Sequence, residues 1–342
     1  MSGRNQHHFW QVLQRGFGTE RKPKYTTVFV YHENTPPFQV GTRNFGAERD
    51  FFDFSPGSGA DSLITSVENR LQGLVKYFQN GGQVTAGHTI EISELITHLE
   101  TRTKFLRQHL AETVSDLLGD LKFWFSDPRL IKKFMKKYAT DNPDEINTLL
   151  APHIQDIGTR TALTAFIIDN FDMLDAGSYQ FAANDSTQPM NAIADSIFEF
   201  AKQGHIKAIL NTKPDSARQN RYLSLKYRLQ TGFSGNLICP DTMVAFLTDR
   251  KPKPFLDKAD RLEAVWVPLS ADLMLIGEPS TKVDRTSREI LRILASTSYQ
   301  AFIANSDTPD FRKLSSRIGK NAHVVTNTEI AALKRDILAG LS

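Results

Sequence analysis

The sequence predicts an α+β fold in which a helical middle packs against a C-terminal mixed β-sheet, with a small hairpin near the N-terminus. Two changes of pattern along the chain predict this class. Apolar residues recur at helical spacing through the middle third, and β-branched or alternating runs follow them. No linker or repeat separates these regions, so we expect one body over residues 1–342, with a subdivision into 1–185 and 186–342 as the alternative.

The N-terminal part is expected to contain a short helix and the hairpin. Apolar side chains at i, i+3 and i+4 spacing over residues 9–17 predict the helix, which Gly16 and Gly18 would end. The run YTTVFVY at 25–31 is β-branched and aromatic, and a Thr-Pro-Pro break separates it from a second short strand at 38–40. These two strands predict the hairpin.

Helices dominate the next part of the sequence. Apolar side chains follow helical spacing from Asp61 to residue 78, and leucines carry a second long helix from Ser93 to Leu121. Prolines then divide a series of shorter helices that extends to about Leu174. Residues 191–203 have the pattern of one more helix, which Gly204 would close.

The C-terminal part changes to strand patterns. Residues 222–230 alternate apolar and polar side chains, whereas 235–248 and 264–277 are β-branched runs that a proline interrupts. A helix at 287–294, a short strand at 302–304 and a terminal pair of helices complete the predicted sheet region.

Composition excludes several classes of protein. The 41 Lys and Arg residues exceed the 38 Asp and Glu residues by only three, so any contact with nucleic acid must be local. A single cysteine, Cys239, excludes an intramolecular disulfide and zinc sites built on paired thiolates. No apolar stretch approaches the roughly 18 residues that cross a bilayer, and the first ten residues lack an apolar export segment. We therefore expect a cytoplasmic protein without a membrane partner.

Three polar residues at the N-terminus are candidates for catalysis. Gln6, His7 and His8 begin the predicted short helix, where adjacent side chains diverge by about 100°. Only one of the two histidines can therefore face a given ligand or act as the base. The alternative is a disordered tail whose histidines have no role.

A second set of candidates follows the second long helix. Glu94, His98, Arg102 and His109 recur at steps of four, four and seven residues, which places them on one narrow stripe. A carboxylate four residues from a histidine can form an acid/base pair, because both side chains reach one point. Ordinary ion pairing on the helix surface is the alternative interpretation.

A basic helix is the third candidate. Its lysines lie on one face of an amphipathic pattern at Lys132, Lys133, Lys136 and Lys137. Such a cluster attracts a phosphate backbone, and it would serve a nuclease and a non-catalytic binding module equally well. The alternative is a solvated face that keeps the protein soluble.

Several short motifs also occur in a fixed order. They are Gln6-His7, Arg15-x-Phe17, the aromatic strand VFVYH, NFGAERDFFDF with Glu48, SVENRL with Glu68, ITHLETRTKFLR with Arg102, ICPDTMV with Asp241, and VWVPLSADLMLIG. In this order they resemble the bacterial family called domain of unknown function 4238. The sequence departs from the family pattern at residues 8–10 and 240–243, where the family usually has Tyr-Val-Pro and Ser-Asp-Asn-Pro.

The resemblance implies that His7, Glu48, Glu68, Arg102 and Asp241 belong together, although they lie far apart in the sequence. Histidine, acids and arginine are the residues of a metal-assisted phosphodiesterase, in which the metal activates water and the arginine stabilises charge on the phosphate. We therefore predict a metal-dependent, nuclease-like effector that acts on RNA or DNA in bacterial antiviral defence or a toxin system. The expected cofactor is Mg²⁺ or Mn²⁺.

The predicted roles are specific. His7 is the general base or a ligand, Glu68 and Asp241 are the metal ligands, and Arg102 is the phosphate clamp. Further candidates are Gln6, Glu48 and His98, with the four lysines as the nucleic-acid contact. Two alternatives stay open: a non-catalytic module that binds nucleic acid or a partner protein of a defence system through the lysine helix, and a buried polar network that fixes the packing of the first helices.

Overall fold

The computed structural model divides the chain into two compact units, one of residues 1–110 and 199–324 and the other of residues 111–198 and 325–342. The structure describes residues 5–22, 25–52, 59–109, 111–112, 115, 119, 127–171, 199, 201–210, 216–249, 251–257, 260–279 and 285–323. The boundary expected at 185/186 lies outside these residues and stays a prediction.

The first unit is an α+β structure with three antiparallel sheets among its described strands, so the C-terminal sheet is antiparallel and not mixed. One sheet has the order β6 (Lys226–Gln230), β10 (Leu273–Glu278), β9 (Leu262–Ser270) and β8 (Ala245–Thr248). A second has the order β2 (Thr19–Lys22), β3 (Tyr25–His32), β11 (Ala301–Ala304) and β7 (Cys239–Pro240), with β4 (Phe38–Gly41) also paired to β3. The third pairs β1 (Asn5–His7) with β5 (Ala47–Arg49). The β3–β4 pair confirms the predicted N-terminal hairpin.

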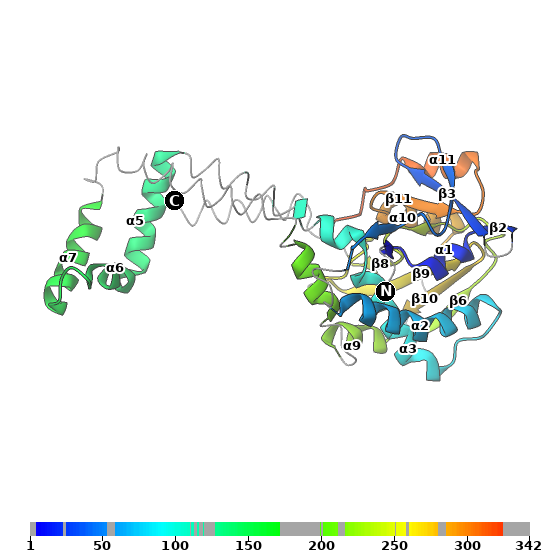
Figure 1. Ribbon diagram of the computed structural model, residues 1–342, viewed down its shortest axis with the longest axis horizontal. Helices are drawn as coiled ribbons and strands as arrows, with labels where there is room; N and C mark the ends of the chain where they lie inside the picture. Colours follow the sequence, from blue (N-terminus) through cyan, green and yellow to red (C-terminus); the bar gives the residue numbers. More distant parts are fainter. Residues whose placement is uncertain are drawn as a thin grey trace. The chain divides into compact units, whose positions relative to one another are not determined.

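Helices cover both faces of the four-stranded sheet. The helices of the first unit include α1 (Gln11–Gly16), α2 (Ala60–Gln79), α3 (Thr89–Thr101), α9 (Ala217–Leu223), α10 (Ser287–Thr297) and α11 (Pro309–Ser315), of which α11 packs on β3 of the other sheet. Figure 1 shows α2, α3 and α9 on one side of this sheet and α10 on the other. α1 and α2 contact β9, and α10 contacts β7 and β8.

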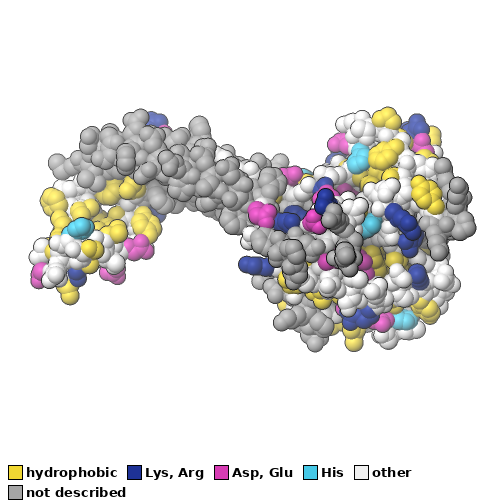
Figure 2. All heavy atoms as spheres, in the orientation of Figure 1, with side chains coloured by type: hydrophobic (Ala, Val, Ile, Leu, Met, Phe, Trp, Pro, Cys, Tyr) yellow, Lys and Arg dark blue, Asp and Glu magenta, His cyan; other side chains and the backbone are white. Residues whose placement is uncertain are grey.

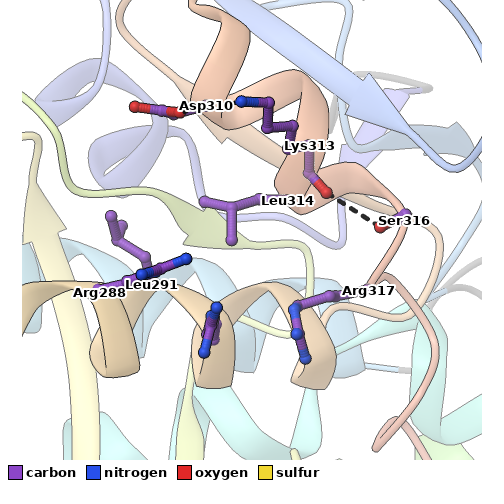
Figure 3. Close-up of a pocket in the computed structure, with 8 residues that line it drawn as sticks. Arg288, Leu291, Asp310, Lys313, Leu314, Ser316 and Arg317 are labelled. Carbon is purple, nitrogen blue, oxygen red and sulfur yellow. Dashed lines mark hydrogen bonds and ion pairs between the residues drawn. The ribbon is translucent and has the colours of Figure 1, made fainter.

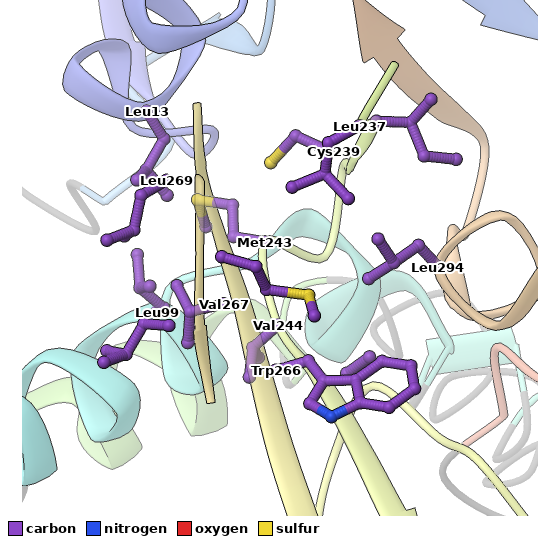
Figure 4. Packing of buried hydrophobic residues seen from close by; sticks show 14 of the residues in the cluster. Leu13, Leu99, Leu237, Cys239, Met243, Val244, Trp266, Val267, Leu269 and Leu294 are labelled. Carbon is purple, nitrogen blue, oxygen red and sulfur yellow. The ribbon is translucent and has the colours of Figure 1, made fainter. Parts of the chain in front are cut away.

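The strand β9 is buried on both faces, which explains why its sequence is a continuous apolar run. Leu269 points toward Leu13 of α1 and Val267 toward Leu99 of α3, whereas Trp266 points to the opposite side, where Leu294 of α10 lies (Figure 4). Side chains from both sheets and from the covering helices thus form one hydrophobic core.

Three predicted elements differ in the structure. The run at 264–277 forms two strands, because the chain passes through Pro268 within β9 and turns only after Ser270. Residues 217–223 form α9, capped by Ser216, so the strand predicted at 222–230 is confined to β6. Helical residues continue from 201 to 210, so Gly204 does not end that helix.

The second long helix is interrupted in the structure. The prediction extends from Ser93 to Leu121, but α3 ends at Thr101 and a new helical segment begins at Lys104. The hydroxyl of Thr103 accepts a hydrogen bond from the backbone N–H of Leu106 at 3.4 Å, which is the contact of an N-terminal cap. The interruption places Arg102 at the cap of α3, where its side chain is buried.

The described part of the second unit is helical. It contains α5 (Pro128–Asp141), α6 (Pro143–Leu150) and α7 (Ile157–Asp169). Prolines divide these helices, as the sequence predicts. Pro128 and Pro143 stand at the first helical positions, where proline is tolerated because an N–H there would have no partner within the helix. No helix among the described residues of either unit is long and apolar enough to cross a membrane.

Candidate functional site

A short strand positions the N-terminal polar residues. Gln6 and His7 lie on β1, opposite Glu48 and Ala47 of β5, and not at the start of a helix as predicted. Adjacent strand residues point to opposite faces, so these two side chains separate. Gln6 is buried and accepts a hydrogen bond from the backbone N–H of Phe52, whereas His7 is half-buried.

Arg102 joins three segments that are distant in sequence. Its side chain is only 1% exposed, and its guanidinium donates to the carboxylate of Glu68 on α2 and to the backbone carbonyl of His7 on β1. The same guanidinium lies 3.0 Å from Nε2 of His98 on α3, which accepts a hydrogen bond. The structure therefore brings together four predicted residues: His7, Glu68, His98 and Arg102.

His98 is neutral in this network. Burial, followed by the charge of Arg102, holds the pKa of His98 well below its usual value. The Nε2 of a neutral imidazole can accept a hydrogen bond from a guanidinium N–H, so the contact is a hydrogen bond and not a repulsion between two cations. The ring of Trp10 lies edge-on to His98 at 6.0 Å and covers it.

His7 has the protonation state that a general base needs. Its Nε2 is 3.2 Å from the backbone carbonyl oxygen of Arg43, which can only accept, so Nε2 carries the proton and Nδ1 is the basic nitrogen. The backbone of Thr42 contributes a further hydrogen bond to the ring. Burial lowers the pKa of His7, and the Arg43 carbonyl opposes this effect. The imidazole is therefore neutral at pH 7 and able to take up a proton.

His8 lies beside an ion pair at the edge of the network. Its Nε2 is 3.9 Å from Glu48, and Glu48 pairs with Lys104, whose side chain is 26% exposed. Burial, with the charges of Lys104 and Arg102, lowers the pKa of His8 to about 3. Its buried Nδ1 has no hydrogen-bond partner among the described residues.

Arg107 and His205 form an extension of the cluster. The Arg107 guanidinium lies 3.7 Å from the centre of the Phe51 ring, 2.6 Å from the Phe51 carbonyl and 3.1 Å from Nδ1 of His205. Nε2 of His205 donates to the Thr101 carbonyl at 2.7 Å. Burial lowers the pKa of His205 to about 3, so it is also neutral. Lys104, Arg107 and His205 were not predicted as site residues, although the first two belong to the ITHLETRTKFLR motif.

Asp241 makes its hydrogen bonds outside this network. Its carboxylate accepts from the backbone N–H groups of Tyr299, Gln300 and Ala301 at 2.7, 2.8 and 3.0 Å, which fixes the start of β11 beside β7. Burial raises the pKa of Asp241 to about 6, against the effect of these donors.

The two predicted metal ligands do not meet at one point. Glu68 is paired with Arg102, and both oxygens of Asp241 accept backbone hydrogen bonds. Within the described ranges, no group of three His, Cys, Asp or Glu side chains could hold a metal ion. These contacts give no support to the predicted Mg²⁺ or Mn²⁺ site, which stays a prediction.

The remaining candidates lie elsewhere. Glu94 pairs with Arg70 of α2 and not with His98, and His109 stacks on Phe105 with ring centres 5.5 Å apart. The four predicted lysines lie on α5 of the second unit, where Lys133 and Lys137 are exposed and Lys132 and Lys136 are half-buried. On the face drawn in Figure 2, charges of both signs are interspersed over the first unit.

Comparison of the chain with protein-family models, with curated proteins and with solved structures gives no match.

Proposed function

We propose that the protein is a nuclease-like enzyme that cleaves a phosphodiester of RNA or DNA at the cluster around His7 and Arg102. The observation that carries the proposal is the convergence on Arg102 of Glu68, His98 and the backbone of His7, which come from α2, α3 and β1. A polar network this deeply buried holds its members in fixed positions, as a catalytic base requires.

His7 acts as the general base in this proposal. Its Nδ1 takes the proton of an attacking hydroxyl or water while the new P–O bond forms, and the leaving oxygen takes a proton from solvent as its bond to phosphorus breaks. The neutral state of His7 at pH 7 suits it for this step. Proton transfer of this kind contributes about 10²–10⁴-fold to the rate.

Lys104 is the cation that we propose attracts the phosphate to the edge of the cluster, on the side of Glu48 and His8. The Arg102 guanidinium is buried and already occupied, whereas Lys104 is partly exposed beside Glu48 and His8. An ammonium there would stabilise negative charge as it develops on the phosphate oxygens. Arg102 is then a positioning residue, which holds His7 through its carbonyl.

The test is incubation of the full chain with labelled RNA and DNA, in EDTA and in Mg²⁺ or Mn²⁺. We expect cleavage that falls by about 100-fold or more in His7→Ala. The matched control is His153→Ala, which removes an exposed histidine of the second unit. Absence of cleavage under all conditions, or equal cleavage by wild type and His7→Ala, would refute the proposal. Cleavage in EDTA would show that no divalent ion is needed.

The rival function is a non-catalytic module that binds nucleic acid or a partner protein. It is favoured by the exposure of Lys133 and Lys137, which lie one turn apart on α5. Charge reversal of these two lysines would then abolish binding while no form of the protein cleaves.

A role in defence or toxicity has its own test. Wild type and His7→Ala are expressed in bacteria with and without phage infection. A defence or toxin role predicts slower growth or fewer plaques with wild type only, and identical behaviour of the two forms refutes it.

A further inference from the structure

A second candidate site lies between α10 and the end of α11, away from the His7 cluster. Here the surface contains a pocket with a volume of about 590 Å³. It is lined by Arg288, Leu291, Arg292, Asp310, Lys313, Leu314, Ser316 and Arg317. Figure 3 shows the two helical segments facing each other, with Leu314 pointing into the space between them.

The pocket is strongly cationic. Four of its lining residues are basic and one is acidic, and Lys313 is 4.0 Å from that acid, Asp310. Among the described residues, the side chains of Arg288, Arg292 and Arg317 have no hydrogen-bond or ion-pair partner. Within the part of the chain that the structure describes, three guanidinium groups are thus available to a ligand.

The sequence places two of these charges where they repel each other. Arg288 and Arg292 are four residues apart on α10, whereas Lys313 is on α11 and Arg317 follows the end of that helix. Like charges at i,i+4 spacing on one helix destabilise it. A bound anion between the helices would offset this repulsion.

We propose that the pocket binds a small phosphate-bearing ligand of the nucleotide class. Arginine matches phosphate with paired N–H donors, so the three free guanidinium groups would hold the phosphates. Leu291 and Leu314 offer an apolar surface for the base, and the volume lies within the range of small-ligand sites. A bounded hollow of this size favours a nucleotide over a long nucleic-acid backbone.

The experiment measures the anisotropy of a fluorescent ATP analogue with the full-length chain. ATP, inorganic pyrophosphate, and a short and a long single-stranded oligonucleotide serve as competitors. We expect saturable binding that ATP displaces more readily than pyrophosphate does, because the base adds apolar contact. Arg292→Glu should weaken binding by about tenfold or more, since it replaces a phosphate donor by a repelling charge. The matched control, Lys320→Glu, makes the same charge change at an exposed residue outside the pocket and should stay within about twofold.

Three results would overturn the proposal: no saturable binding at millimolar nucleotide, equal weakening by Lys320→Glu, or displacement by the long oligonucleotide but not by ATP. The last result would identify a nucleic-acid backbone as the ligand. Arg292→Gln and Arg317→Gln repeat the test if circular dichroism shows that Arg292→Glu is unfolded. Binding is also measured with His7→Ala, which should bind normally, so this result is independent of the nuclease proposal.

Discussion

The Arg102 network makes a quantitative prediction about stability. Arg102→Met removes a buried cation and leaves the Glu68 carboxylate and the His7 carbonyl without their donor. Breaking a buried ion pair from one side costs about 3–5 kcal/mol. Because the Glu68 side chain is 24% exposed and water reaches the carboxylate left behind, we expect the lower end of that range, about 3 kcal/mol.

Glu68→Gln completes a double-mutant cycle. It keeps an oxygen that accepts from Arg102 but leaves the buried guanidinium without its counter-charge, so it should also cost about 3 kcal/mol in the free energy of unfolding. The double variant should then be about 1 kcal/mol more stable than the sum of the two single effects predicts. The reason is that it contains neither the Arg102 cation nor the Glu68 carboxylate, so no charge is left without its partner. Arg70→Met is the matched control, since its pair with Glu94 is largely exposed and should cost no more than about 1 kcal/mol.

The assay is urea unfolding followed by tryptophan fluorescence. Trp10 is buried and lies beside His98, so its emission reports on this part of the first unit. A cost below about 1 kcal/mol for Arg102→Met would contradict the reasoning, because it is no larger than the expected cost of an exposed pair. Additivity of the Arg102→Met and Glu68→Gln effects within about 0.3 kcal/mol would also contradict it, because two groups in one network are expected to couple.

Two further predictions concern acid stability and packing. The pKa of His205 is lowered from 6.5 to about 3, so as the pH falls this histidine is protonated in the unfolded chain before it is protonated in the folded one. Its contribution to stability is complete above pH 6.5 and should fall by about 3 kcal/mol over the next two pH units. Urea unfolding midpoints should show this loss, and His205→Gln should show a smaller one. A Cβ at Gly16 would lie 2.3 Å from the backbone oxygen of Leu269, so Gly16→Ala should cost about 1–3 kcal/mol in thermal unfolding. Gly73→Ala, with open space around it inside α2, should instead stabilise by about 0.5–1 kcal/mol.

The elements with strong local signals were predicted well. The Thr-Pro-Pro break between two β-branched runs predicts the β3–β4 hairpin, and regular apolar spacing predicts α2 close to its observed bounds. The turn between β9 and β10 was missed because Ala271-Asp272 has neither Gly nor Pro, while Pro268 falsely signals a break. Pro268 fits inside β9 because the pairing of β9 with β10 shifts register at Leu273/Met274, opposite the proline. Such an irregularity is where a sheet tolerates a residue that has no N–H to donate.

The candidate site was only partly predictable, because local sequence patterns do not determine which distant residues meet in the fold. The ordered motifs grouped His7, Glu68 and Arg102, and their convergence is a property of the fold that spacing alone does not determine. Asp241 belongs to the same set of motifs, but its hydrogen bonds hold β11 beside β7. His205 is a single histidine with no characteristic spacing, so no pattern could have placed it against Arg107.

The interruption of the helix after Thr101 favours a positioning role for Arg102 in the proposed reaction over a contact with substrate. Arg102 stands at the cap of α3, so the chain can leave the helix there while the guanidinium reaches both the preceding helix α2 and β1. A phosphate that bound this guanidinium would displace Glu68 and the His7 carbonyl and leave both acceptors without this donor. Arg102→Lys keeps the charge but cannot donate to two partners from one planar group. If the arginine positions His7, this variant should lower kcat with little change in KM, whereas a phosphate clamp would chiefly raise KM.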